Sequence, residues 1–422
     1  VQALFPRSSF GQEKESVAVL LTEDDIIEKA LKASETFQIS KNQIRILNEK
    51  YREIRAQILP QVTGESTWTY NASFPGNKIS DYENANTVTG SQILWAFGRV
   101  RSAIDAAQKA FQISFLDKDA ARREIVYNAK LAYYAALLAE ETYAIVNGSY
   151  ENVVENKKIL EDRSARGRVS KQDNIKIAAD VAARIPEVNN ARAALKAARN
   201  SLKIVTGITF EQPIKLSQSY AETYARLDYD KLEAELLAGE PTLLALSETI
   251  LLKDEIIAQR RAEYLPAFSA FGSYSYQGGG DSLAPASNSL DSYSAAGVKV
   301  SVPLFTGFET TARLEQAKID KYNSELTLRQ RTEQLLLELQ NAVSNYHEFV
   351  DNLEANNEAV RLAEESFRLS QELFTTGQIT VTDLNDAELL LTNQRLARLQ
   401  TLYRINVTLA RIEKLTQTEG DA

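Results

Sequence analysis

Few side chains of this sequence could carry out chemistry. The chain has 422 residues, with a single histidine, His347, and no cysteine. A cysteine–histidine pair, or a metal cage of imidazole and thiolate ligands, therefore cannot be assembled within one chain. The three glycines at 278–280 precede a polar loop rather than a helix, which does not favour a phosphate-binding turn. We predict no enzymatic activity, no cofactor and no metal site.

Two acidic residues stand out by their spacing. Asp383 and Asp386, in the stretch VTDLND, lie three residues apart at the start of a predicted helix and so share one face. On residue type alone, acids in this position are explained by the helix dipole, which favours negative charge at the N-terminus.

Composition narrows the class of protein. Hydrophobic residues make up 44% and charged residues 25%, as in ordinary folded chains. The net charge of −9 gives no support to a nucleic-acid partner. The sequence contains no apolar run of the roughly 18–20 residues that a membrane-spanning helix needs. It begins at Val1 without a basic and apolar leader, so we expect that any signal peptide has been removed.

The chain repeats itself. The stretch ARGRVSKQDNIK at 165–176 shares its frame with TTGQITVTDLND at 375–386. The stretch YREIRAQILP at 51–60 likewise matches IAQRRAEYLP at 257–266, and further matches follow in the same order. We therefore predict two tandem copies of one structural unit.

Each copy contains the same elements. A helix, at about 23–58 or 241–263, ends at a Leu-Pro pair, because proline stops a helix. Two stretches of alternating polarity follow on either side of a polar loop. The predicted strands are 61–72 and 86–95 in the first copy, and 267–276 and 292–303 in the second.

The strands have the length and pattern of a membrane barrel. Val298, Val300 and Val302 share a face opposite Lys299 and Ser301. Strands of about 10 residues suffice to cross a bilayer when tilted. Aromatic residues near the strand ends are typical of an interfacial girdle: Trp68, Tyr70, Tyr274, Tyr276 and Tyr293.

Very long helices are predicted after each strand pair, at about 98–163 and 308–374. Apolar residues recur every 3.5 residues on average in the second: Leu335, Leu339, Ala342, Tyr346, Phe349, Leu353, Val360, Ala363, Phe367 and Phe374. This heptad period predicts a coiled coil. At 1.5 Å per residue, such a helix is roughly 100 Å long.

The repeated glycine stretches reverse these helices. We expect Gly377 to supply a left-handed turn and Thr382 or Asp383 to cap the returning helix. Gly167 and Asp173 occupy the equivalent positions in the first copy. A plain helical connection explains each turn alone. Two equivalent tips on the two longest helices also indicate a place for a partner or a gate.

The order and duplication of these elements resemble the TolC-like outer membrane efflux protein family over about 23–417. The resemblance implies a mainly α fold with a small transmembrane β part: tandem-duplicated long coiled-coil hairpins plus four strands per chain. It implies a homotrimer whose twelve-stranded β-barrel in outer membrane lipid continues as an α-helical barrel into the periplasm of a Gram-negative-type bacterium. It also implies a passive export channel of a tripartite efflux pump or type I secretion system. The implied partners are a periplasmic adaptor (membrane fusion) protein and an inner-membrane pump or ABC transporter.

The family resemblance also assigns residues. Acidic side chains of the second returning helix ring the periplasmic entrance in the family, and Asp383 and Asp386 match them here. The residues that match the adaptor-docking tips are Arg163, Gly167, Val169 and Asp173 in the first hairpin, and Phe374, Gly377 and Ile379 in the second. Some relatives carry an arginine at the position of Ile379, so a latch of that kind is not expected here.

The expected domain organisation follows. Residues 1–22 form an N-terminal extension, 23–207 the first repeat with its tip at about 163–173, and 208–240 an irregular equatorial linker. Residues 241–417 form the second repeat with its tip at about 374–383, and 418–422 a tail. The alternatives are a periplasmic coiled-coil adaptor and a structural scaffold, neither of which requires four strands. The sequence leaves the exported substrate open.

Overall fold

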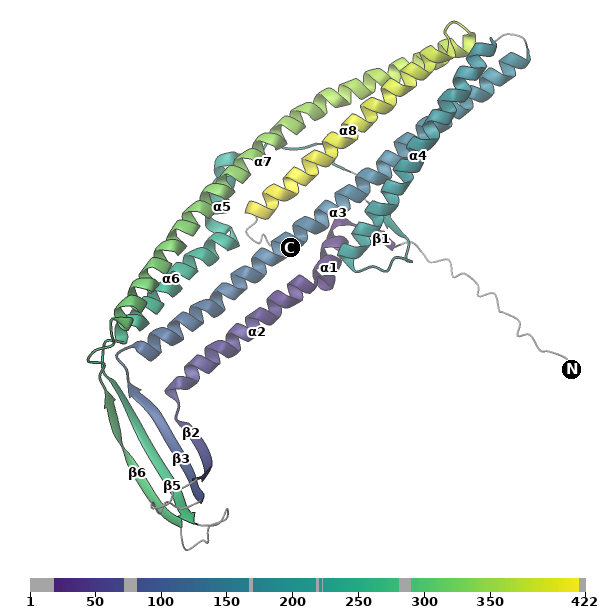
Figure 1. The fold of residues 1–422 in the computed structure, drawn as a ribbon. Coiled ribbons are helices and arrows are strands. Elements are labelled where there is room, and N and C mark those ends of the chain that lie inside the picture. The colour runs from purple at the N-terminus through teal and green to yellow at the C-terminus, as the bar shows by residue number, and fades with distance from the viewer. Residues whose placement is uncertain are drawn as a thin grey trace, which may run out of the picture. The chain divides into compact units, whose positions relative to one another are not determined.

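The structure is a computed structural model that describes residues 19–71, 82–166, 170–217, 220–221, 223–280 and 290–416 (Figure 1). The chain forms two compact units. Unit 1 comprises Val1–Gln38, Ala120–Glu240 and Glu333–Ala422, and unit 2 comprises Ile39–Asp119 and Pro241–Thr332. These units do not coincide with the predicted repeats, because each long helix contributes residues to both. The division into tandem repeats stays a prediction.

The two predicted long helices are confirmed to within two residues. Helix α3 spans Arg99–Ala165 and α7 spans Glu309–Thr376. The heptad positions of α7 are buried as the period requires: Leu335, Leu339, Ala342, Tyr346, Leu353, Ala363, Phe367 and Phe374. Phe349 and Val360 are half-buried. A 3.5-residue period keeps one seam facing its neighbours over many turns, which explains how so long a helix is held.

Each long helix is followed by a returning helix, α4 at Lys171–Thr206 and α8 at Val381–Thr416. Helix α4 ends at Gly207, whose φ of 68° is left-handed and favours glycine. The position is also crowded, since a Cβ atom on Gly207 would lie 2.7 Å from the Cβ atom of Ala33 in α1 (Glu23–Ala33). Glycine thus both ends α4 and permits α1 to pack against it.

The segment 208–240 is more regular than predicted. It contains strand β4 at Ile214–Leu216 and helix α5 at Tyr229–Gly239. Strand β4 pairs in parallel with β1 at Val19–Leu21, which belongs to the expected N-terminal extension. Between β4 and α5, the Leu227 amide donates to Nε2 of His347 over 3.2 Å. The only histidine therefore has a structural partner.

The predicted first helix, 23–58, is broken in the structure. Helix α1 ends at Ala33, α2 spans Glu35–Arg55, and a short 3-10 helix, η1, spans Ala56–Ile58. The break lies at Ser34, which is extended (ψ 115°) and whose hydroxyl accepts from the Phe37 amide at 3.2 Å. Serine competes for backbone groups in this way and favours caps over helix interiors. The corresponding helix α6 is continuous over Pro241–Ala262.

Unit 2 contains an antiparallel sheet of four strands in the order β2-β3-β5-β6. The strands are Gln61–Tyr70, Tyr82–Trp95, Ala267–Gly280 and Leu290–Ser301. Strands β3 and β5 are longer than predicted, and the glycines at 278–280 belong to β5 rather than to a loop. Main-chain pairing with β3 explains the extension, since Tyr82 lies opposite Gly280. The last residue of the predicted first strand, 72, lies outside the described residues.

The register separates two chemically different faces of this sheet. The strands carry four charged side chains, and all lie on one face: Glu65, Glu83, Asp291 and Lys299. Over the described strand residues, the other face carries no charge and bears Val62, Val88, Val298, Val300, Trp68 and Tyr274. Tyr293 lies on the charged face, opposite to the other residues of the predicted girdle, and Tyr274 and Tyr276 lie well inside β5.

No helix within the described ranges combines the length and the apolar character needed to cross a membrane.

Candidate functional site at the hairpin tips

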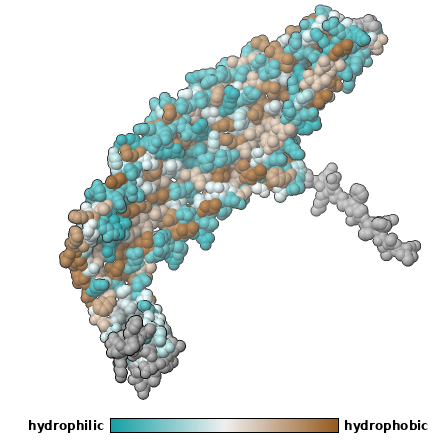
Figure 2. Space-filling model, in the orientation of Figure 1, coloured by the Kyte–Doolittle hydropathy of each residue, from teal (hydrophilic) through white to brown (hydrophobic). Residues whose placement is uncertain are grey.

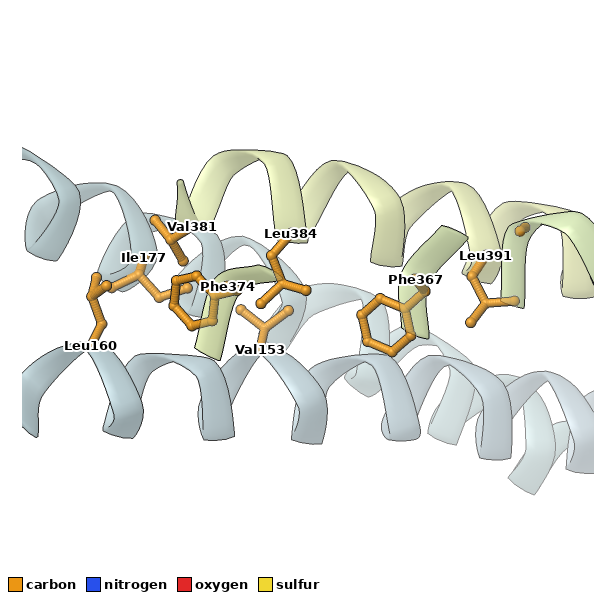
Figure 3. Packing of buried hydrophobic residues seen from close by; sticks show 9 residues of the cluster. Val153, Leu160, Ile177, Phe367, Phe374, Val381, Leu384 and Leu391 are labelled. Atoms are coloured by element: carbon orange, nitrogen blue, oxygen red, sulfur yellow. The ribbon is translucent and has the colours of Figure 1, made fainter. Parts of the chain in front are cut away.

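The ends of the two helical hairpins in unit 1 share one hydrophobic cluster. In Figure 3, Val153 and Leu160 of α3 and Ile177 of α4 point toward side chains of α7 and α8. The members from the second hairpin are Ala363, Phe367, Phe374, Val381, Leu384 and Leu391. Fully burying one such large apolar side chain is worth about 1.5–3 kcal/mol. The two tips are therefore packed as one body.

Gly377 forms the predicted left-handed turn at the end of α7. Its φ is 77°, its amide donates to the Phe374 carbonyl at 3.0 Å, and the next amide, of Gln378, donates to the Leu373 carbonyl at 2.9 Å. This pair of bonds is a Schellman motif, which satisfies carbonyls that the end of a helix leaves free. A Cβ atom on Gly377 would meet nothing within 4 Å. Glycine is therefore favoured at this position by the left-handed backbone and not by a lack of space for a side chain.

The residue that caps the returning helix lies two residues before Thr382 and three before Asp383, the two predicted caps. Thr380 caps α8: its hydroxyl accepts from the Asp383 amide at 3.2 Å, while the Asp383 carboxylate accepts from the Thr380 amide at 2.9 Å and hydroxyl at 2.7 Å. Neither Thr382 nor Asp383 is the cap itself. In the first hairpin, the Ser170 hydroxyl donates to the Asp173 carboxylate at 2.7 Å and accepts from the Asp173 amide at 3.1 Å. Both tips therefore use a threonine or serine followed three residues later by an aspartate.

The electrostatic surroundings of the two acids differ. The hydroxyl and amide of Thr380 hold the pKa of Asp383 below its usual value, and the nearby charge of Lys176 acts in the same direction. Asp386 is exposed one turn further along α8. Asp383 is thus occupied in part as a helix-capping residue, and Asp386 projects a carboxylate into solvent.

Arg163 connects the two tips. Its guanidinium donates to the Thr375 carbonyl at 3.0 Å and lies 4.6 Å from the centroid of the Phe374 ring. Both interactions are favourable, because a cation at a helix C-terminus complements the dipole and the ring face attracts a guanidinium. Arg166 and Lys171 are exposed, so they add positive charge to the surface of the first tip.

The sequence did not reveal a series of polar contacts between the returning helices. Lys176 Nζ donates to the Thr382 hydroxyl (3.2 Å), and the Asn385 amide donates to the Asp180 carboxylate (2.8 Å). Arg184 pairs with Glu388 at 2.9 Å, with side chains only 12% and 2% exposed. The spacing of four residues along α4 was visible in the sequence, but no local signal indicated the partners on α8.

Two further contacts complete the buried ion pair. The Ser149 hydroxyl accepts from Arg184 at 2.7 Å, and the Thr392 hydroxyl donates to the Glu388 carboxylate at 2.9 Å. Buried charges require such partners, because each has lost its water. We name the three contacts Lys176–Thr382, Asp180–Asn385 and Arg184–Glu388 the α4–α8 ladder.

The predicted tip residues are placed as follows. The structure brings together Arg163 and Phe374, and Ile379 packs against the hydrophobic cluster. Asp173 lies in the first turn of α4, Gly377 lies in the turn after α7, and Gly167 and Val169 lie outside the described residues. Across the described ranges, no group of three or more His, Asp or Glu side chains is placed to hold a metal ion.

Comparisons with known proteins give the family. The sequence model of the family described as "Outer membrane efflux protein" matches residues 232–417. The chain is 23% identical over 403 residues to the cation efflux system protein CusC of Escherichia coli (strain K12), covering 90% of this chain and 83% of that protein. It is 22% identical over 372 residues to the outer membrane protein TolC of the same strain, covering 85% and 75%.

Solved structures agree on the fold. A crystal structure of CusC superposes with a TM-score of 0.81 at 17% identity, covering 98% of this chain and 95% of that one. The open-state MtrE outer membrane channel of Neisseria gonorrhoeae gives 0.76 at 20% identity, covering 93% and 88%. We conclude that residues 232–417 belong to the outer membrane efflux protein family and that the chain is an efflux channel of the outer membrane that extends into the periplasm, not an enzyme.

Proposed function

We propose that the channel is a homotrimer in which each chain contributes four strands to a twelve-stranded barrel. The observation that carries this proposal is the sheet of unit 2, which is open at β2 and β6 and has one uncharged face. Lipid does not tolerate unpaired strand edges, because backbone groups there find no water. Pairing of β6 with β2 of the next copy removes both edges. The uncharged face then meets lipid, and Glu65, Glu83, Asp291 and Lys299 line the lumen.

The proposed role is that of a passive duct in a tripartite efflux pump or a type I secretion system. In this role the channel docks onto a periplasmic adaptor, and an inner-membrane pump or ABC transporter supplies the energy. A wide lumen selects little, so the substrate is set by the pump. A periplasmic adaptor or a scaffold would use the hairpins but would leave an amphipathic sheet without a purpose.

Docking is assigned to the joined hairpin tips. The residues proposed for it are Arg163, Gly167, Val169, Asp173, Phe374, Gly377 and Ile379. A groove of about 260 Å³ beside Phe374 supports this assignment, and Asn152, Asn156, Ile159 and Leu384 also line it. The bond of Arg163 to Thr375 supports the view that a partner meets both tips together.

Asp383 and Asp386 are proposed to ring the periplasmic entrance of the trimer. Rings of carboxylates favour cations and bind multivalent ones. The capping bonds of Asp383 fix its carboxylate at the start of α8, so Asp386 is the freer of the two.

The assembly is tested by extraction in detergent. We expect a particle of three 47.0 kDa chains by light scattering, and aggregation when detergent is withdrawn. A soluble, stable monomer would refute the barrel. Copurification from cross-linked cells then identifies the adaptor and pump, and recovery of the trimer with no periplasmic partner would refute the tripartite role alone.

A further inference from the structure

Residues 223–228, which lie between β4 and α5, help to tie the two helical hairpins of unit 1 together. We name them the crossing segment. Just before it, the Tyr220 hydroxyl donates to the Tyr134 carbonyl of α3 at 2.9 Å. Within it, the Tyr224 hydroxyl accepts from the side-chain amide of Asn406 in α8 at 2.6 Å. This part of the chain therefore contacts a helix of each hairpin.

Two adjacent side chains fasten the crossing segment to α7. The Tyr346 hydroxyl donates to the Ala225 carbonyl at 2.8 Å, and Nε2 of His347 accepts from the Leu227 amide at 3.2 Å. Because Nε2 is an acceptor here, it carries no proton and the imidazole is neutral. A protonated imidazole has two N–H donors and no acceptor. Uptake of one proton would therefore break this bond and leave two donors facing each other.

The tyrosine bonds of this region do not respond to pH near neutrality. Burial raises the pKa of Tyr220, of Tyr224 and of Tyr346, so all three hydroxyls keep their protons. An imidazole, in contrast, ordinarily changes its charge between about pH 5 and 8. His347 is the only histidine of the chain. It is therefore the side chain here whose capacity to accept a hydrogen bond changes in that range.

Several charged groups lie on the elements around His347. Asp351, one turn further along α7, pairs with Arg226 of the crossing segment at 3.2 Å. The Asp228 carboxylate accepts from an amide at the start of α5, Glu348 of α7 is exposed, and Arg404 of α8 lies over an aromatic ring of α7. Carboxylates ordinarily titrate about two pH units below imidazole, so their effects can be separated from that of His347.

Water reaches this region. The side chains of Arg226 and Asp351 are 73% and 62% exposed, and His347 is half-buried. In Figure 2, hydrophilic residues are prominent where α7 and α8 form the surface. Because the channel extends into the periplasm, the imidazole can exchange protons with the periplasmic fluid.

We propose that His347 is a proton-sensitive latch between the two hairpins of each chain. The neutral imidazole holds the crossing segment on α7. When the periplasm is acidified, the imidazolium releases the Leu227 amide, and the tyrosine bonds alone remain. Movement of one hairpin relative to the other is then easier at low pH. The latch acts within one chain and does not depend on the proposed trimer or its partners.

Hydrogen exchange at the Leu227 amide tests the latch in the detergent-solubilised protein. Rates are measured at about pH 7.5 and about pH 5.5, on either side of the imidazole range, and corrected for the intrinsic effect of pH. We expect the protection of Leu227 to fall about tenfold at the lower pH, which is the size of effect that loss of one hydrogen bond produces. The Ser217 amide, bonded to the Leu21 carbonyl at 3.1 Å, should stay protected at both values. Equal protection of Leu227 at both values would overturn the proposal.

Variants identify the group that takes up the proton. His347→Gln should protect Leu227 at both pH values, because the glutamine oxygen accepts a hydrogen bond and does not titrate. His347→Phe should lose the protection at both. Tyr346→Phe and Asp351→Asn are the matched controls, since each removes a neighbouring contact and leaves the imidazole, so the dependence on pH should remain. A dependence that persists in His347→Gln, or that disappears in Asp351→Asn, would refute the role of His347.

The effect on the hairpins is measured with spin labels. The chain has no cysteine, so Asn190→Cys on α4 and Leu362→Cys on α7, both exposed, give one labelled pair per chain. In protein diluted with unlabelled chains, the distance distribution should broaden at about pH 5.5. The same labels in the His347→Gln background should show no change. A distribution that stays constant while Leu227 loses its protection would refute the coupling of the latch to the hairpins.

Discussion

The buried pair of Arg184 and Glu388 should hold the two returning helices together. Removing one partner leaves the other charge buried and unpaired, which typically costs about 3–5 kcal/mol. The side chains are 12% and 2% exposed, so solvent screens the pair little. We therefore expect Arg184→Met or Glu388→Leu alone to lower the free energy of local opening by about 3–5 kcal/mol. Replacing both should cost about 1 kcal/mol or less, because apolar side chains of similar size fill the space.

Hydrogen exchange of the detergent-solubilised protein measures this opening segment by segment. Since 1.4 kcal/mol is a factor of ten, protection of the start of α8 should fall roughly a hundredfold or more in each single variant and recover in the double variant. Arg368→Met is the control, because Arg368 pairs with Glu365 at 2.7 Å on the exposed face of α7. That variant should leave exchange unchanged.

One result would refute the prediction for the Arg184–Glu388 pair. If the two single substitutions add in the double variant, Arg184 and Glu388 do not stabilise each other, and the hydrophobic cluster alone holds the tips. A loss of protection throughout the chain in the single variants would instead show that the pair supports the whole fold.

Further predictions concern the entrance, the tip and the end of α4. Asp383→Ala with Asp386→Ala should weaken both the cation preference and the block by polyvalent cations in planar-bilayer recordings; an unchanged block would place the constriction elsewhere. Because the pKa of Asp383 is lowered in the folded state, its capping contribution is present above the usual carboxylate pKa and is lost as pH falls through the folded value. Exchange of the first turn of α8 should therefore rise only in that acidic range. Gly377→Trp should abolish dye export by cells while leaving trimer yield intact, and surviving export would make the tip a mere connector. Gly207→Ala should lower the thermal midpoint through its clash with Ala33, and Ala33→Gly should restore part of it.

Much of the fold follows from local patterns. The heptad period of α7 required a long helix with one buried seam, and the structure has it to within two residues. Alternation in GVKVSVP indicated a strand with two unlike faces, and β6 shows this alternation. Two predictions from local patterns were wrong. The first helix is broken at Ser34, and main-chain pairing extends β5 over the glycines at 278–280.

Local sequence patterns predicted only part of the candidate site. The turn at Gly377 was predicted because a left-handed residue after a helix favours glycine. The cap was misplaced, since Thr380, Thr382 and Asp383 all have side chains that can cap, and the choice depends on where α8 begins. Arg163 was assigned to docking only through the family resemblance. Its bond to the Thr375 carbonyl was not predicted, because nothing near Arg163 in the sequence indicates that helix end as a partner.

The sequence by itself determined the kinds of elements, their order and the residues at which they turn, because helix periods, strand alternation, proline and glycine act over a few neighbouring residues. The tertiary structure alone decided which elements meet. Strand β3 pairs with β5 from the other copy, and Arg184 of α4 meets Glu388 of α8, across about 200 residues of chain. Such contacts depend on the packing of whole helices and sheets, so the residues near each partner in the sequence carry no sign of them.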